Sequence, residues 1–323
     1  GGTFDISIIE AKNQDVTVLA SEGVKKLGGD DFDAALQKIV QNKFKEATGE
    51  TLDIETGYTK TDAEEDKKSL SKREKVNVRV EKTNIELNRS EFEKEISSLL
   101  AQTEMLCENA IEEAGLKLKD IKDVLLVGGS TRVPCVTESV KKIFKKDPVT
   151  TVNVDEAVVL GASLFSALKG DQADLNPAQK ASISKLAVTD VSVGCFGTSA
   201  VRGSNQEEYI EVLIKKNEKI PCSVTKSFYT VADNQTAVTC KISQSDSPTD
   251  DPRWVNTIWD GELALPSGRR AGQQVDVTYS YDENGTMHAS FVDVATGKET
   301  YTTLSDITPT VDEKGDIDRF VVD

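Results

Sequence analysis

The sequence predicts an α/β domain followed by an all-β antiparallel sandwich. Up to about Leu168, short apolar runs typical of strands alternate with segments whose apolar residues recur at the period of an amphipathic helix. Beyond Asp190, apolar and polar residues alternate over short runs that are separated by turn residues. Between these halves, Asp, Gln, Asn, Pro, Ala and Ser dominate residues 171–184, which we interpret as part of a linker.

Length and composition limit the function classes. The chain has 323 residues, enough for two domains that each bury a core. Its net charge of -16 argues against nucleic acid or an anionic membrane as the main partner. The five cysteines are scattered and form no close pair typical of a metal or redox motif, which predicts a cytoplasmic location. The first residues show no signal sequence and no initiator methionine, so we expect the natural chain to begin earlier.

The first elements expected are a β-hairpin and a helix. Residues 6–9 and 16–19 are β-like and flank a polar turn, which predicts the hairpin. Asp30 and Asp31 can cap the start of a helix, and Gly49 is placed to end it. The apolar face of this helix consists of Phe32, Leu36, Ile39, Val40 and Phe44.

A longer helix is predicted to begin with a capping box at residues 90–93 and to end at Gly115. The residues in register on this helix are Phe92, Ile96, Leu99, Thr103, Leu106 and Ala110. Four consecutive apolar residues at 124–127 then predict a strand that is buried on both faces. A further helix is expected at 157–168, closed by Gly170.

The predicted buried strand runs into a turn that suits a ligand. Gly128 and Gly129 remove the side chains that would keep a ligand away from the backbone. Ser130, Thr131 and Arg132 supply donors at the edge of the turn. Glycine turns also end many parallel strands for steric reasons alone, so this turn by itself is weak evidence of a site.

The second half carries the hairpin signals of an antiparallel sandwich. Residues 228–231 and 237–242 are β-like and are separated by a turn at 233–235. Asn-Gly at 284–285 and Thr-Gly at 296–297 mark two further reversals. The alternating residues expected to face the core are Val275, Val277, Tyr279, Tyr281, Met287, Ala289 and Phe291.

Six motifs occur along the chain: GGTFD at 1–5, LGGDDFD at 27–33, EEDKKSLS at 64–71, VGGSTRVP at 127–134, NVDEA at 153–157 and ADNQTAV at 232–238. In this order they resemble the heat-shock protein 70 chaperones of the DnaK type. The resemblance implies the second lobe of an actin-like nucleotide-binding domain at 1–169, an interdomain linker at 170–190, a peptide-binding β-sandwich at 191–306 and a tail without a helical lid at 307–323.

The resemblance also implies a nucleotide site, which in the intact protein holds ATP or ADP with Mg²⁺. The implied residues are Gly1, Gly2 and Thr3 as the phosphate loop, Glu64, Lys67, Lys68 and Ser71 as the adenosine-binding face, and Gly128, Gly129, Ser130 and Arg132 as the facing wall. Asp155 is expected either to accept a hydrogen bond from the ribose side or only to cap its helix. Without the resemblance, the spacing of Glu64, Lys67 and Ser71 is typical of a solvated, charged helix.

In the sandwich, the resemblance implies a groove for extended apolar peptides. The implied lining residues are Thr198, Phe228, Val231, Val238 and Cys240. Alternating apolar residues on a strand usually belong to the core, and the resemblance outweighs this interpretation only for Val231 and Val238. His288, the only histidine, has no partner at a catalytic spacing and is interpreted as structural. No metal ligand and no catalytic residue is assigned within the chain.

The expected function is that of an ATP-dependent chaperone active in the stress response, which couples its nucleotide state to its affinity for unfolded proteins. J-domain co-chaperones and nucleotide exchange factors are the further partners that the resemblance implies. The first ATPase lobe of the family is absent from the sequence, so this chain alone is expected to hydrolyse no ATP.

The alternative is a lidless co-chaperone or scaffold that binds nucleotide without cycling. It is favoured by the polar segment 183–190 and by residues 307–323, which show no long helical period. A sugar kinase or a filament protein fits poorly, because neither carries a sandwich after Asp190.

Overall fold

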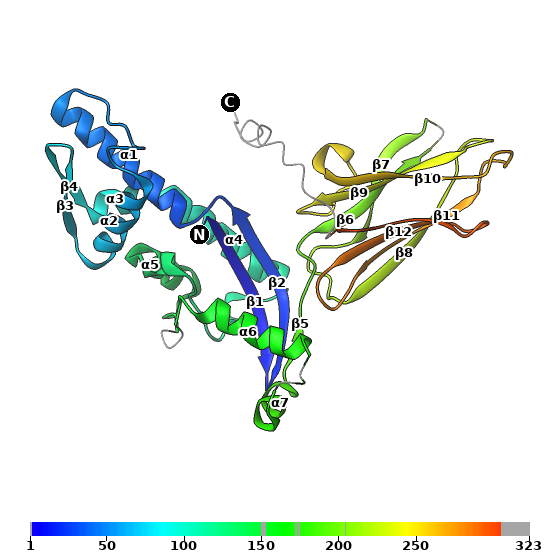
Figure 1. The fold of residues 1–323 in the computed structure, drawn as a ribbon, viewed down its shortest axis with the longest axis horizontal. Helices are drawn as coiled ribbons and strands as arrows, with labels where there is room; N and C mark the ends of the chain where they lie inside the picture. The colour runs from blue at the N-terminus through cyan, green and yellow to red at the C-terminus, as the bar shows by residue number, and fades with distance from the viewer. Residues whose placement is uncertain (1, 150–152, 172, 174, 204, 305–323) are drawn as a thin grey trace. The chain divides into compact units, whose positions relative to one another are not determined.

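The computed structural model of the protein describes residues 2–149, 153–171, 173, 175–203 and 205–304. The chain divides into two compact units, Gly1–Val188 and Thr189–Asp323, which are described separately (Figure 1). Gly1 and the tail expected at 307–323 lie outside the described residues. Within the described residues, each helix is too short or too polar to cross a bilayer.

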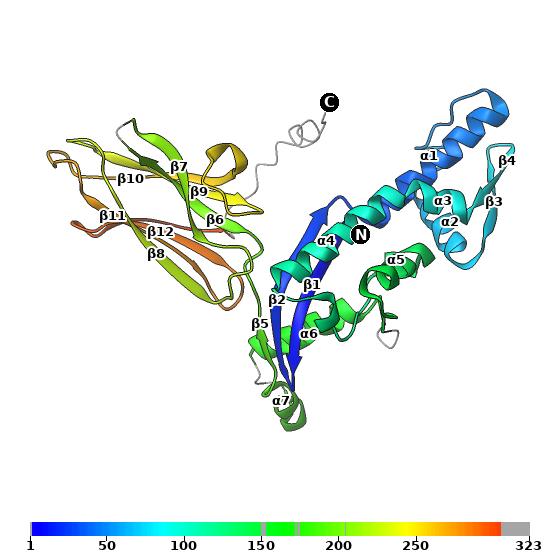
Figure 2. The same cartoon turned by 180° about the vertical axis from the view of Figure 1, so that it is seen from behind.

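The first unit begins with the predicted hairpin, in longer strands than expected. Strands β1 (Thr3–Lys12) and β2 (Asp15–Lys25) pair antiparallel, and the short strand β5 (Ala187–Thr189) adds to β2. Helix α4 (Ser97–Glu113) lies along the hairpin in both views (Figures 1 and 2). Ile8 and Ala20 of the hairpin are buried in one core with residues of α4.

A second core in this unit lies among three helices and a small hairpin. Its elements are α1 (Gly29–Thr48), α2 (Lys60–Lys72), β3 (Lys75–Val80), β4 (Thr83–Asn88) and α3 (Arg89–Glu95). The predicted apolar face of α1 is confirmed, since Phe32, Leu36 and Phe44 are buried. Gly49 ends α1 in the left-handed conformation, with φ 79°, which favours glycine.

The long helix expected from residues 90–93 onward is divided into α3 and α4. Ile96, with φ -90° and ψ 4°, separates them and is completely buried. The expected capping box is wrong, because the chain passes from β4 directly into α3 with Asn88 at the N-cap position. Ser90 therefore lies inside the first turn. Gly115 follows the end of α4, with φ 67°.

The prediction of a strand buried on both faces at 124–127 is wrong. Leu125 forms a single parallel bridge to Val149, and Leu125 and Val127 remain 49% and 40% exposed. An apolar run becomes a doubly buried strand only when neighbouring strands and helices cover it, and in the described part of the chain this run forms only that one bridge.

The segments on either side of this run are helical. The 3₁₀ turns are η1 (Leu118–Asp120) and η2 (Gly129–Arg132), and the helices are α5 (Pro134–Phe144), α6 (Ala157–Lys169) and α7 (Pro177–Ile183). Helix α6 confirms the prediction at 157–168, but no residue of α6 is buried. Helix α7 gives the expected linker a structured part, capped where the Asn176 carboxamide oxygen accepts from the Gln179 amide at 2.9 Å.

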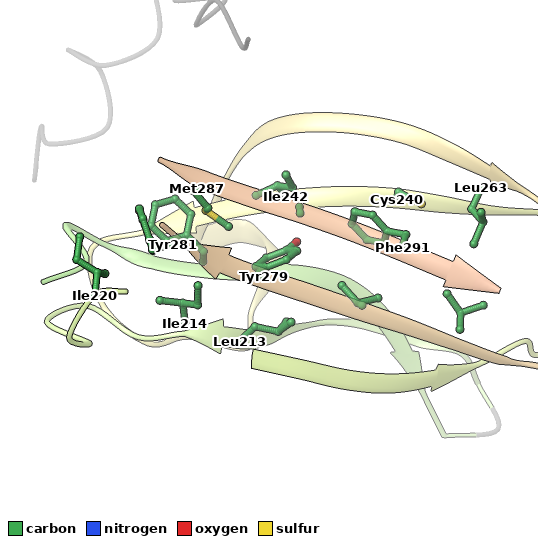
Figure 3. Packing of buried hydrophobic residues seen from close by; sticks show 14 of the residues in the cluster. Leu213, Ile214, Ile220, Cys240, Ile242, Leu263, Tyr279, Tyr281, Met287 and Phe291 are labelled. Atoms are coloured by element: carbon green, nitrogen blue, oxygen red, sulfur yellow. The ribbon is translucent and has the colours of Figure 1, made fainter. Parts of the chain in front are cut away.

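The second unit is an antiparallel sandwich of two four-stranded sheets, in the orders β10-β9-β6-β7 and β13-β12-β11-β8. The strands are β6 (Cys195–Arg202), β7 (Glu207–Ile214), β8 (Cys222–Tyr229), β9 (Ala237–Ser245), β10 (Asn256–Ala264), β11 (Gln274–Tyr281), β12 (Met287–Asp293) and β13 (Lys298–Thr303), with the 3₁₀ turn η3 (Pro252–Trp254) before β10. The two sheets enclose one apolar core (Figure 3).

The alternating residues predicted for β11 and β12 face this core. Tyr279 and Phe291 are at most 2% exposed and make an edge-to-face contact with ring centroids 6.3 Å apart. The Tyr279 hydroxyl lies 3.1 Å from the Gly197 carbonyl and 2.9 Å from the Lys241 carbonyl. The tyrosine thus satisfies its one polar atom inside the core by bonding to the opposite sheet.

Candidate functional site

Helix α2 carries the residues expected to face the adenosine, and a capping box fixes its start. The Thr59 amide donates to the Asp62 carboxylate at 2.8 Å, and the Asp62 amide donates to the Thr59 hydroxyl at 3.3 Å. Leu70, completely buried, holds the helix to the second core. Glu64 and Lys68 consequently lie on the solvent side.

Lys67 does not project from this face into solvent. Its ammonium lies 2.6 Å from an Asp33 carboxylate oxygen and donates to the Gly29 carbonyl at 3.0 Å. The two side chains are only 11% and 4% exposed. Burial raises the pKa of the Asp33 carboxyl, and the bond from Lys67 opposes that rise. Lys67 therefore ties α2 to the start of α1.

The other predicted residues of α2 bond locally. Lys68 lies 3.1 Å from Glu64 and 2.8 Å from Glu65, and its hydrogen bond lowers the pKa of Glu64. The Ser71 hydroxyl donates to the Lys67 carbonyl at 2.9 Å. Glu64, Lys68 and Ser71 remain accessible on the surface, so a ligand can displace these exposed pairs at small cost.

The turn at Gly128 carries the residues expected to form the facing wall of the nucleotide site. Gly128 has φ 91° and donates its amide to the Val154 carbonyl at 2.8 Å. This positive φ, combined with ψ 152°, makes glycine the favoured residue at this position. A Cβ on Gly128 or Gly129 would meet nothing within 4 Å, so backbone is open on that side as predicted. The next residue after η2, Val133, is buried in the same core as Leu70 of α2.

Arg132, at the end of η2, forms an ion pair with Asp155. Both side chains are more than half exposed. Of the two interpretations of Asp155, the helix-capping one is wrong, because Glu156 occupies the N-cap position of α6. Asp155 instead holds the Arg132 guanidinium at the surface.

The predicted phosphate loop is described from Gly2 onward. The Gly2 carbonyl accepts from the Leu27 amide at 3.2 Å, and a Cβ on Gly2 would lie 3.3 Å from the Asp30 carboxylate. Asp30 is paired with Lys60 at 3.0 Å, and that hydrogen bond lowers the pKa of Asp30. Throughout the described residues, no group of three or more His, Cys, Asp or Glu side chains is arranged to hold a metal ion.

The predicted peptide-binding residues divide by burial. Val231 is 48% exposed, whereas Phe228 and Val238 are half-buried against the sandwich core. Thr198 and Cys240 are 3% and 0% exposed, because they face inward from adjacent parts of one sheet. In this structure their side chains do not reach a surface groove. Burial raises the pKa of the Cys240 thiol to about 12.

The match to a protein family covers the complete chain. Residues 1–323 match the family model described as Hsp70 protein. The chain belongs to the Hsp70 family. It is accordingly a chaperone of the Hsp70 type, and its mixed α/β unit and β-sandwich agree with that assignment.

In this Hsp70-family chain, the segment that carries Val231 is held by a loop that contains no predicted site residue. Residues 230–236, which we call the 230s loop, hydrogen bond to residues 265–273, which we call the support loop. The Thr230 amide donates to the Gln273 carbonyl at 2.9 Å, and the Leu265 amide donates to the Thr236 carbonyl at 2.7 Å. The signal in the sequence was the arginine pair at 269–270, with Gly268 directly before it and Gly272 two residues after it.

Proposed function

We propose that this Hsp70-type chaperone binds exposed apolar segments of unfolded polypeptides beside Val231. The observation that supports this most is a half-exposed valine on a mostly polar loop, which is flanked in the sequence by half-buried Phe228 and Val238. The Val231 amide donates to the Gln235 side chain at 3.1 Å, and Gln235 in turn donates to the Ala237 carbonyl at 2.9 Å. An apolar side chain on a braced loop suits recognition of an extended peptide.

The first unit, in this proposal, binds ATP or ADP. Arg132 offers its guanidinium plane to the base, while Glu64, Lys68 and Ser71 offer polar contacts from α2. Gly2 and Thr3 would approach the phosphates. The nearby Asp30 disfavours a bare phosphate, which fits a nucleotide that brings Mg²⁺ bound to its own oxygens.

The finer assignments are also proposals. We propose a DnaK-type protein with segments at 1–169, 170–190, 191–306 and 307–323. We also propose a cytoplasmic location and a role in the stress response. Its proposed partners are J-domain co-chaperones and nucleotide exchange factors. The second candidate function is a lidless co-chaperone or scaffold that binds nucleotide without cycling. It is supported by Lys67, which is held by Asp33 inside the unit and not presented at the surface.

The test is a titration of a fluorescent, extended, apolar peptide against the protein and two matched variants. Val231 and Val193 are 48% and 69% exposed, but only Val231 lies on the 230s loop. A charge at the contact opposes apolar binding, so Val231→Asp is expected to weaken peptide binding by about tenfold or more, about 1.4 kcal/mol. Val193→Asp is expected to leave it unchanged. Equal affinities for both variants would refute the proposed site.

A further inference from the structure

A buried ion pair anchors the support loop to the far end of β12. The two terminal guanidinium nitrogens of Arg269 lie 2.6 Å and 3.0 Å from the two carboxylate oxygens of Asp293. Asp293 is completely buried, and the Arg269 side chain is 18% exposed. Such a two-point contact fixes direction as well as distance, which a single contact does not.

Neighbouring groups complete the hydrogen bonding of this pair. The Gln273 side-chain oxygen accepts from Arg269 at 2.9 Å and 2.6 Å. The Thr296 hydroxyl donates to Asp293 at 2.6 Å. Arg269 holds the pKa of Asp293 below its usual range, so the carboxylate stays charged. The arginine side chain is therefore held between its own loop and the β12–β13 turn.

The backbone of the support loop in turn fixes the 230s loop. The Arg269 carbonyl accepts from the Asn234 amide at 2.8 Å, and the Asn234 side chain accepts from the Gly268 amide at 3.1 Å. The Ala271 amide donates to the Asp233 carboxylate at 2.8 Å. Asn234 itself has φ 56°, a left-handed conformation that asparagine tolerates in turns.

We propose that Arg269 is a positioning residue for peptide binding. Its fork-like contact with Asp293 holds the support loop, and the support loop holds the 230s loop that carries Val231. When the two-point contact between Arg269 and Asp293 is weakened, the 230s loop opens more often. A bound peptide therefore dissociates faster. The inference rests on the proposed function, because it concerns the lifetime of the peptide complex at Val231.

The decisive variant is Arg269→Lys, which keeps a positive charge near Asp293 but cannot make the two-point contact with its carboxylate. The dissociation rate of the fluorescent apolar peptide is expected to rise about tenfold, while its association rate changes by less than about threefold. Amide hydrogen exchange at Asn234 and Ala271 is expected to quicken, and exchange at Tyr279 in the sandwich core is expected to stay the same. A general loss of folding would quicken exchange at all three.

Two control variants separate the role of Arg269 from general effects on folding. The double variant Arg269→Met with Asp293→Leu leaves no buried unpaired charge, so it is expected to fold and still to release peptide quickly. Lys226→Met removes an ion pair to Glu211 elsewhere in the sandwich and is expected to leave peptide release unchanged.

Three results would overturn the proposal. Slow exchange at Asn234 and Ala271 that survives in Arg269→Lys would do so whether or not peptide binds. Unchanged peptide release in Arg269→Lys, with Val231→Asp still weakening binding, would overturn the role of Arg269 alone. A protein that binds no apolar peptide would refute the proposed function and, with it, any effect of Arg269 on peptide lifetime.

Discussion

At the scale of single residues, the Lys67–Asp33 pair leads us to predict how the stability of a variant depends on pH. Lys67→Met leaves the Asp33 carboxylate buried without its cation, which is expected to destabilise the first unit by about 3–5 kcal/mol near neutral pH. The folded-state pKa of Asp33 is raised already by burial and rises further without Lys67. A raised folded pKa means that the neutral form is favoured, so stability falls as the pH rises through that pKa.

The measurement is denaturant unfolding of Lys67→Met between about pH 4, near the unfolded pKa of Asp, and pH 7. The deficit relative to the unchanged protein is expected to shrink toward the acid end. Lys68→Met, which removes an exposed partner of Glu64 and Glu65, is the control and is expected to cost less than about 1 kcal/mol. A deficit that is constant with pH would show that Asp33 is not the group left unpaired.

The sequence could predict which residues are polar or apolar at these positions, but not their partners. Lys67 and Asp33 lie in separate motifs, and their contact depends on how α2 packs against α1. Similarly, Thr198 and Cys240 alternate with their neighbours as groove residues would, and only the arrangement of the strands shows that they face inward. Side-chain direction in a sheet follows register, which a single sequence specifies weakly.

At the scale of elements, two candidate N-caps behave differently. Thr59 accepts a hydrogen bond from the Asp62 amide, whereas Ser90 lies inside α3 and is not its cap. Thr59→Ala is therefore expected to cost about 1 kcal/mol of unfolding free energy. Ser90→Ala is expected to change it by less than about 0.5 kcal/mol. Thermal or denaturant unfolding of the two variants checks this, and a larger loss for Ser90→Ala would restore the capping box that the sequence predicted.

Some turns and helix ends could be predicted from the local sequence pattern alone. Hairpin turns at Gly285 and Gly297 and the end of α1 at Gly49 were predictable, because positive φ angles of 71–79° favour glycine. The prediction of a buried strand at 124–127 was wrong, because an apolar run carries no information about what covers it. Ile96 shows the same limit, since the division between α3 and α4 interrupts a regular helical period.

At the scale of the whole molecule, the proposal requires that nucleotide in one unit change peptide release in the other. If the protein cycles as a chaperone, ATP is expected to raise the peptide dissociation rate, because a ligand shifts an equilibrium by its differential affinity for two states. Arg132→Ala removes the proposed contact with the base and is expected to raise the ATP concentration needed by about tenfold. Arg79→Ala, an exposed arginine of the same unit, is the control and is expected to have no effect. If ATP binds but does not change the peptide dissociation rate, the result would instead support the scaffold function. It would not contradict the proposed peptide site at Val231.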